Sequence, residues 1–269
     1  MSSESERALI GDTLPMWNKH DLRLHLEDLG VSSGMTLLVH SSLRAFGYVI
    51  GGVETVIEVL LEAVGTQGTL VMPAFSAQLS DPGDWQDPPM PTKWLEKVRL
   101  SMPPFDSTRT ATWGVGSIPE QFRSWTGVLR SNHPIDSFCA YGKNAAAIVE
   151  GHSLDFALGN NSPLARVYEL NGFILLLGVG HDVNTSLHFA ELRSGIRALV
   201  TIGARVQVNL NPTWIKYQDC DYDSSEFCKV GEAFEACTNI TRCALVGTAH
   251  AKLIPQRQLV NFAEEYFKI

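Results

Sequence analysis

The stretch Phe173-Ile-Leu-Leu-Leu-Gly-Val-Gly-His-Asp-Val-Asn-Thr-Ser-Leu-His-Phe-Ala-Glu191 decides the fold. Its first part, residues 173–177, is an uninterrupted apolar run that is too short for a helix, and this indicates a buried strand. Glycines at 178 and 180 then end the strand. The sequence therefore predicts a strand that leaves the core abruptly and leads into a polar segment.

That polar segment predicts a helix with a base and a carboxylate on one side. Asn184 or Thr185 can cap its first turn, and His188 and Glu191 are three residues apart, which puts them on the same face. In α/β sheets, ligands bind beyond the carboxyl ends of the strands. The pair is therefore a candidate catalytic site, although an ordinary His–Glu pair on an exposed helix is an equally open interpretation.

Upstream, strand and helix patterns alternate. Asn18 with Asp21 resembles a capping box for a leucine-rich helix that stops at Gly30. Residues 35–39 and 69–72 are apolar strands, and between them residues 53–64 keep helical spacing. Strand, helix and strand in this order form a βαβ unit, whose crossover we expect to be right-handed.

Downstream, the pattern changes. Residues 76–112 form a long segment rich in Pro, Asp and Trp, and segments of this kind usually build lids or binding walls. Residues 197–217 alternate apolar and polar side chains, as antiparallel strands do, and a last helix carries Leu259 and Ala263. We expect a single α/β domain over residues 1–269, with mixed sheet sandwiched by helices.

Composition limits the class of protein. The chain has 269 residues, 45% of them hydrophobic, and a formal net charge of −8, which argues against a nucleic-acid partner. It holds no apolar run of about 18 residues, so we expect no membrane partner. Residues 1–7 are polar and unlike a secretory signal, and the five cysteines include no CxxC pair. A cytoplasmic protein without a structural metal is predicted.

Three further segments can carry chemistry. The loop from His40 to Gly52 joins a strand to a helix, where backbone N–H groups bind anions and Arg44 can contact a phosphate. Residues 105–123 lead through hydroxyls and glycines into a helix that begins near Ser117. His133 precedes Pro134 and is therefore extended, which favours a side chain presented at a loop rather than buried. Each segment alone is also compatible with an ordinary connecting loop.

Together these segments resemble one family. His40-Ser-Ser-Leu43, Thr110-Ala-Thr-Trp-Gly-Val-Gly-Ser-Ile-Pro-Glu-Gln-Phe-Arg123, Arg130-Ser-Asn-His-Pro134 and Asn184-Thr-Ser-Leu-His-Phe-Ala-Glu191 occur in the order found in the aminoglycoside 3-N-acetyltransferases. The resemblance runs from about Trp17 to the C-terminus. This antibiotic N-acetyltransferase family is unrelated in fold to the GNAT acetyltransferases.

The resemblance implies transfer of an acetyl group from acetyl-CoA to the 3-amino group of 2-deoxystreptamine aminoglycosides, which gives antibiotic resistance. It also implies roles for residues. His188 matches the catalytic histidine, Glu191 its carboxylate, and His133 a histidine that lines the same pocket. The matches to the cofactor-contacting segments are His40, Ser41, Ser42, Leu43, Thr110, Gly114 and Val115.

The sequence departs from the family pattern at two positions. Ala111 stands where a proline is frequent, and Asp136 stands where many members carry a second histidine. Asp136 can change amine recognition, and Asp81 and Asp84 in the long acidic segment are candidates for a wall that binds a polycationic substrate. The alternative for that segment is a solvated loop.

The chemistry agrees with this family. An amine must lose a proton before it attacks a thioester, and histidine, whose ordinary pKa is about 6.5, is suited to accept that proton. Three alternatives remain: an acetyltransferase for another amine, a silent drug-binding protein, and a metal hydrolase that uses His133, His188 and Glu191 as ligands. The sequence leaves the oligomeric state open, with a homodimer as one candidate.

Overall fold

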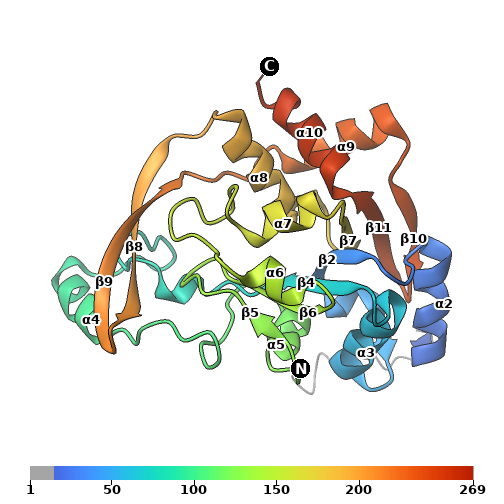
Figure 1. The fold of residues 1–269 in the computed structure, drawn as a ribbon, viewed down its shortest axis with the longest axis horizontal. Coiled ribbons are helices and arrows are strands. Elements are labelled where there is room, and N and C mark those ends of the chain that lie inside the picture. The colour runs from blue at the N-terminus through green and yellow to red at the C-terminus, as the bar shows by residue number, and fades with distance from the viewer. Residues whose placement is uncertain (1–14, 269) are drawn as a thin grey trace.

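A seven-stranded mixed sheet runs through the centre of the molecule in the computed structural model, which describes residues 15–268 (Figure 1). Residues 1–14 and residue 269, which include the polar segment 1–7 and both ends of the predicted domain, lie outside the described residues. In sheet order the strands are β10 (Arg242–Val246), β11 (Ala249–Pro255), β7 (Phe173–Leu177), β2 (Thr36–Ser41), β4 (Thr69–Pro73), β6 (Phe138–Gly142) and β5 (Leu129–Arg130).

The middle of this sheet is parallel and its edges are antiparallel. Strand β2 pairs in parallel with β4 on one side and β7 on the other, whereas β11, β10, β6 and β5 add antiparallel pairs outside them. Helix α3 (Gly52–Val64) joins β2 to β4, so the predicted βαβ unit is confirmed.

Alternate residues of the central strands enter two separate cores. In β2, Leu37 and Val39 belong to one apolar cluster and Leu38 belongs to the other, and all three are fully buried. Because successive side chains of a strand point to opposite faces, a strand covered on both sides is apolar throughout. This explains the continuous apolar runs in the sequence.

Helices cover both faces, which confirms the predicted sandwich. One face packs against α2 (Lys19–Leu29), α3 and α5 (Ser117–Arg123). The other packs against α6 (Ala145–Val149), α7 (Pro163–Glu169), α8 (Thr185–Ser194), α9 (Phe227–Thr238) and α10 (Gln256–Tyr266), most of which lie above the sheet in Figure 1.

The predicted alternating segment forms a separate hairpin of β8 (Leu199–Val208) and β9 (Asn211–Cys220), which curves away from the central sheet (Figure 1). The long acidic segment packs against this hairpin through Leu79, Met102 and Phe105, with Trp214 of β9 against them. It includes the short helix α4 (Leu95–Ser101), which the sequence did not predict.

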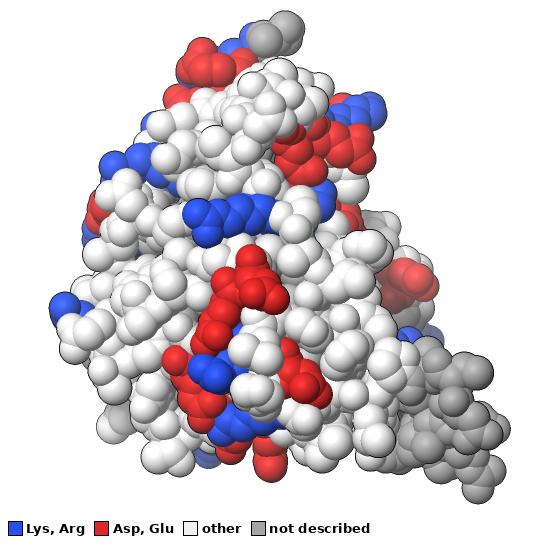
Figure 2. Space-filling model, turned by 90° about the vertical axis from the view of Figure 1, so that its right-hand side faces the viewer, with Lys and Arg blue, Asp and Glu red and all other residues white. Residues whose placement is uncertain are grey.

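The remaining elements are short. They are the strand pair β1 (Met16–Trp17) and β3 (Tyr48–Val49), and the 3₁₀ turns η1 (Leu43–Phe46), η2 (Ala77–Leu79), η3 (Thr92–Trp94) and η4 (His181–Val183). None of the helices within residues 15–268 is long and apolar enough to cross a membrane. On the side of the molecule that lies at the right of Figure 1, acidic and basic side chains are intermixed (Figure 2).

Candidate active site

Helix α8 presents the predicted pair directly beyond the carboxyl end of β7. Asn184 caps the helix, because its side chain accepts the backbone N–H of Ser186 at 3.2 Å. One turn later, His188 Nδ1 lies 2.7 Å from Glu191 Oε2. The His188 side chain is 19% exposed and that of Glu191 is fully buried. The predicted face is confirmed, and Glu191 leaves only the Nε2 side of His188 available to a ligand.

Arg197 completes the pair, and the sequence analysis did not identify it. Its Nε donates to Glu191 Oε1 at 2.6 Å, and its terminal nitrogen contacts the same oxygen. The guanidinium also donates to the backbone carbonyl of Asp223 at 2.9 Å. A fully buried carboxylate needs a compensating charge, and Arg197 supplies it on the side opposite His188.

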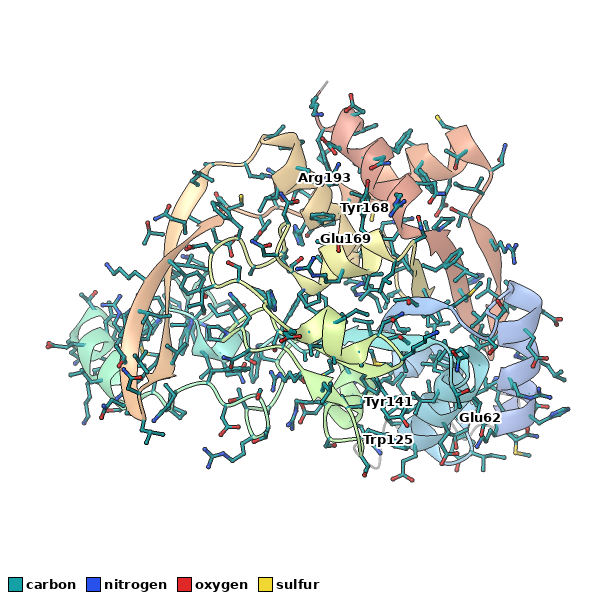
Figure 3. All side chains as sticks on the ribbon, viewed as in Figure 1. Glu62, Trp125, Tyr141, Tyr168, Glu169 and Arg193 are labelled. Carbon is teal, nitrogen blue, oxygen red and sulfur yellow. The ribbon has the colours of Figure 1, made fainter. Side chains whose placement is uncertain are left out.

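Aromatic rings hold the imidazole from its other sides. The centroid of the Phe227 ring lies 4.6 Å from that of His188, and the Tyr222 ring lies at 5.0 Å. The C-terminal half of α8 is also anchored, because Arg193 donates to Glu264 of α10 at 2.7 Å and lies over the ring of Tyr168 (Figure 3). The position of His188 is therefore determined by packing around the whole helix.

His188 opens into a cavity of about 700 Å³ at the carboxyl ends of β2, β4 and β7. Residues 40–44 of the predicted loop and residues 114–117 line this cavity, and Asp182 and Val183 line it next to α8. The lining residues include His40, Ser41, Ser42, Leu43, Arg44, Gly114, Val115 and Thr185. Most of the predicted cofactor-binding residues therefore surround the predicted base.

The polar groups of this wall are arranged to meet a ligand. Burial, and next the charge of His188, lowers the pKa of His40 to about 3, so His40 is uncharged at neutral pH. Its Nε2 lies 3.3 Å from the Thr185 hydroxyl. Within residues 15–268, the buried hydroxyl of Ser41 finds no hydrogen-bond partner. No atom of this region lies within 4 Å of where a Gly114 Cβ would stand, so a ligand can approach that backbone closely.

The expectation that His133 is presented at a loop and lines this cavity is wrong. His133 is fully buried and is not a lining residue. Its Nδ1 accepts the backbone N–H of Asp136 at 2.8 Å, and its Nε2 lies 3.3 Å from the carbonyl of Leu154. The hairpin and the segment after α6 cover the ring: Tyr217 packs edge-on and His152 stacks on it. Both ring nitrogens therefore serve the local fold.

Four more predicted residues, Thr110, Asp81, Asp84 and Asp136, do not line the cavity. The polar groups of Thr110 serve the local fold instead: its hydroxyl accepts the backbone N–H of Asp106, and its carbonyl accepts from Arg130. Asp81 is paired with Arg99, whose Nε lies 2.9 Å from Oδ1. Asp84 lies in the same turn and also does not line the cavity. The side chain of Asp81 therefore stabilises the fold of the acidic segment.

Asp136 belongs to an acidic pair on the far side of Tyr222. Burial, and next the charge of Asp219, raises the pKa of Asp136 to about 7, although its side chain is still 20% exposed. Burial likewise raises the pKa of Asp219. Burial, and next the charge of Asp219 with a smaller effect from Asp136, raises the pKa of the Tyr222 hydroxyl. The Tyr222 ring contacts His188. Neither carboxylate lines the cavity, and Asp219 is buried. The two carboxylates repel each other, and their joint field favours a cation.

The metal-hydrolase alternative needs His133, His188 and Glu191 at one point. The hydrogen bonds of His133 hold it against Leu154 and Asp136 instead. Nowhere in the described part of the chain do three or more His, Cys, Asp or Glu side chains form a group that could hold a metal ion. These residues therefore do not supply the ligand set that this alternative requires.

The chain belongs to the aminoglycoside 3-N-acetyltransferase family, whose model matches residues 38–268. A relative from Bacillus subtilis strain 168, the SPbeta prophage-derived aminoglycoside N(3')-acetyltransferase-like protein YokD, is 41% identical over 93% of this chain and 92% of its own. Aminoglycoside N(3)-acetyltransferase IX of Micromonospora chalcea is 35% identical over 91% and 90% of the two chains.

Solved structures agree with this family. The crystal structure of YokD from Bacillus subtilis has a TM-score of 0.95 at 40% identity and covers 97% of both chains. A binary complex of AAC-IIIb with CoASH has a TM-score of 0.82 at 26% identity, over 94% of this chain and 97% of that one. AAC-VIa bound to sisomicin has a TM-score of 0.82 at 30% identity, over 94% and 98%.

Proposed function

We propose that this protein transfers the acetyl group of acetyl-CoA to the 3-amino group of 2-deoxystreptamine aminoglycosides, and so inactivates these antibiotics in the cytoplasm. One observation carries the proposal. His188, held by the buried Glu191, opens into a cavity walled by the His40–Leu43 loop. Membership of the family and the relatives named for this activity support it.

His188 acts as the general base. Because its Nδ1–H donates to Glu191, its Nε2 carries the lone pair and accepts a proton from the attacking amine. The imidazolium that forms is then stabilised by the carboxylate, whose own charge is balanced by Arg197. Proton transfer by a positioned base contributes about 10²- to 10⁴-fold to a rate.

The cavity residues fit acetyl-CoA, which supplies the activated acetyl thioester. The His40–Leu43 loop and the Gly114–Val115 segment would hold the cofactor from two sides. The free Ser41 hydroxyl is a donor for it, and Arg44 is a partner for its phosphates. Thr110 supports this wall indirectly through its hydrogen bonds to Asp106 and Arg130.

The acceptor amine enters from the side of Tyr222. Asp136 and Asp219 attract its positive charge, and each amine that binds there favours the ionised form of a carboxylate. We assign this role to that pair rather than to Asp81 and Asp84. His133 supports the turn that carries Asp136 and takes no part in proton transfer.

The test is an acceptor panel. Purified protein is incubated with acetyl-CoA and with gentamicin, sisomicin, apramycin or simple diamines, and the release of free thiol is followed together with the position of the new amide. Acetylation at the 3-amino group of aminoglycosides is expected. Turnover confined to simple amines would establish the second candidate, an acetyltransferase for another amine, for which the departure at Asp136 is the supporting observation. A homodimer stays a prediction, and analytical ultracentrifugation of the purified protein would measure its oligomeric state.

A further inference from the structure

A buried histidine behind the cavity has no role in the reaction described so far. His181 begins η4, the turn between β7 and α8, and is only 3% exposed. Its Nε2 lies 2.9 Å from Glu235 Oε1 on α9, and its Nδ1 lies 3.3 Å from the Asn184 side-chain nitrogen. His181 therefore joins the cap of the catalytic helix to a charged group on another helix.

The hydrogen-bond directions in this chain of contacts are fixed from both ends. At one end, the backbone N–H of Ser186 can only donate, so Asn184 turns its oxygen to Ser186 and its N–H₂ to His181. At the other end, Lys252 donates to both oxygens of Glu235 at 2.7 and 2.9 Å, so Glu235 is an acceptor. His181 must therefore be neutral, with its proton on Nε2 and its lone pair on Nδ1.

The fold makes room for this arrangement. Gly231 lies one turn before Glu235 on α9, and a Cβ at that position would stand 2.2 Å from the ring carbons of His181. Lys252 comes from β11, which pairs with β7 at Leu176. The network therefore connects the sheet, α9 and the start of α8.

We infer that His181 is a positioning residue for acetyl transfer, because its Nδ1 acceptor holds Asn184 in the orientation that caps α8 and so fixes His188. Glu235 and Lys252 hold the imidazole in the tautomer that makes this possible. The same turn carries Asp182 and Val183 of the cavity wall. A shift of this turn moves both the base and that wall.

Two substitutions separate this role from simple packing. The side-chain oxygen of Asn falls near the position of histidine Nδ1, and the side-chain nitrogen of Gln falls near Nε2. His181→Asn therefore keeps the acceptor for Asn184 and loses Glu235, whereas His181→Gln keeps Glu235 and loses the acceptor. Misplacement of a catalytic group by about 1 Å costs up to about 10²-fold, so we expect kcat of H181Q to fall by about 10- to 100-fold and kcat of H181N to exceed it by at least about 10-fold.

Gln is closer to His in volume than Asn is, so packing alone predicts the reverse order. Gly231→Ala, which displaces the ring, should reproduce the loss of H181Q. A kcat for H181Q that equals or exceeds that of H181N would overturn the inference.

The kinetic comparison rests on the proposed function, and a spectroscopic measurement does not. Nitrogen-15 NMR of the wild-type protein at neutral pH reports which ring nitrogen of His181 carries the proton. We expect the neutral Nε2–H form of His181 in the wild-type protein, whether or not the protein turns over acetyl-CoA. A proton on Nδ1, or on both nitrogens, contradicts the inference even if the enzyme is active. Absence of turnover with this tautomer present contradicts only the proposed function.

Discussion

Glu191→Gln is expected to abolish most of the activity by moving one proton on His188. In wild type, both Arg197 contacts aim at Glu191 Oε1, and His188 Nδ1 donates to Oε2. A glutamine in the same place must turn its oxygen to Arg197, because the guanidinium has only donors. Its N–H₂ then faces His188 Nδ1, which must become an acceptor, and the proton moves to Nε2. The lone pair that faces the cavity is lost.

The magnitude follows from the contacts that the active tautomer would have to break. Opposing two donors inside the protein costs about 1–3 kcal/mol, and losing a hydrogen bond to a charged group costs about 1.5–3 kcal/mol. Together these costs correspond to a decrease in kcat of about 10²- to 10⁴-fold. Thiol release under saturating acetyl-CoA and acceptor measures it, and thermal unfolding checks that E191Q remains folded.

A second substitution makes the argument specific. With Arg197→Met added, the side-chain amide of the introduced glutamine is free to rotate and to offer its oxygen to His188 Nδ1. Coupled neighbours interact by about 0.5–3 kcal/mol, and we therefore expect E191Q/R197M to recover kcat at least about 10-fold over E191Q. R197M alone should be less stable than the double variant, because it removes the cation that balances the charge of the buried Glu191 carboxylate. If the double variant is no more active than E191Q, the tautomer argument is refuted.

Three further outcomes follow from the site. His188→Ala should lower kcat at least about 10²-fold while binding of CoA, measured by calorimetry, persists; retention of more than about a tenth of kcat would show that His188 is not the base. Ser41→Leu with Ser42→Leu should raise KM for acetyl-CoA more than KM for the acceptor, and equal increases would indicate a folding defect. The pKa of Asp136 is raised to about 7 by burial and by Asp219, so its contribution to stability is present at acidic pH and is lost as pH rises through neutrality. Asp136→Asn should therefore raise Tm relative to wild type at pH 8 more than at pH 5, and a difference that does not change with pH contradicts the assignment.

Local patterns predicted the elements that bring His188 and Glu191 together. The apolar run 173–177, the glycine break and the Asn184 cap all act within a few residues, so spacing alone places the pair on one face. The βαβ unit was predictable for the same reason. Strands β10 and β11 were not predicted. Strand β10 is exposed over most of its length, and two of the buried alternate positions of β11 are Ala249 and Ala251, which mark a strand only weakly.

The groups that tune the site come from distant or irregular segments. Arg197 reaches Glu191 only because α8 ends at Gly195 and the chain folds back. The burial of His133 depends on Tyr217, far along the chain. Asp81 is paired with Arg99, 18 residues away, and the local sequence around Asp81 does not indicate this partner. Local sequence does not encode such partners.

Under the proposed function, the reaction and the choice of acceptor are carried by different parts of the fold. Helix α8 holds His188 and is fixed to the sheet side by Asn184 and His181 and to α10 by Arg193. Asp219 instead lies near the end of the β8–β9 hairpin, outside the central sheet. Arg197 is the link between them, because it lies between α8 and β8 and binds Glu191. Substitutions beyond Leu199 in the hairpin can therefore change acceptor preference without moving the base, whereas a change at Arg197 affects both.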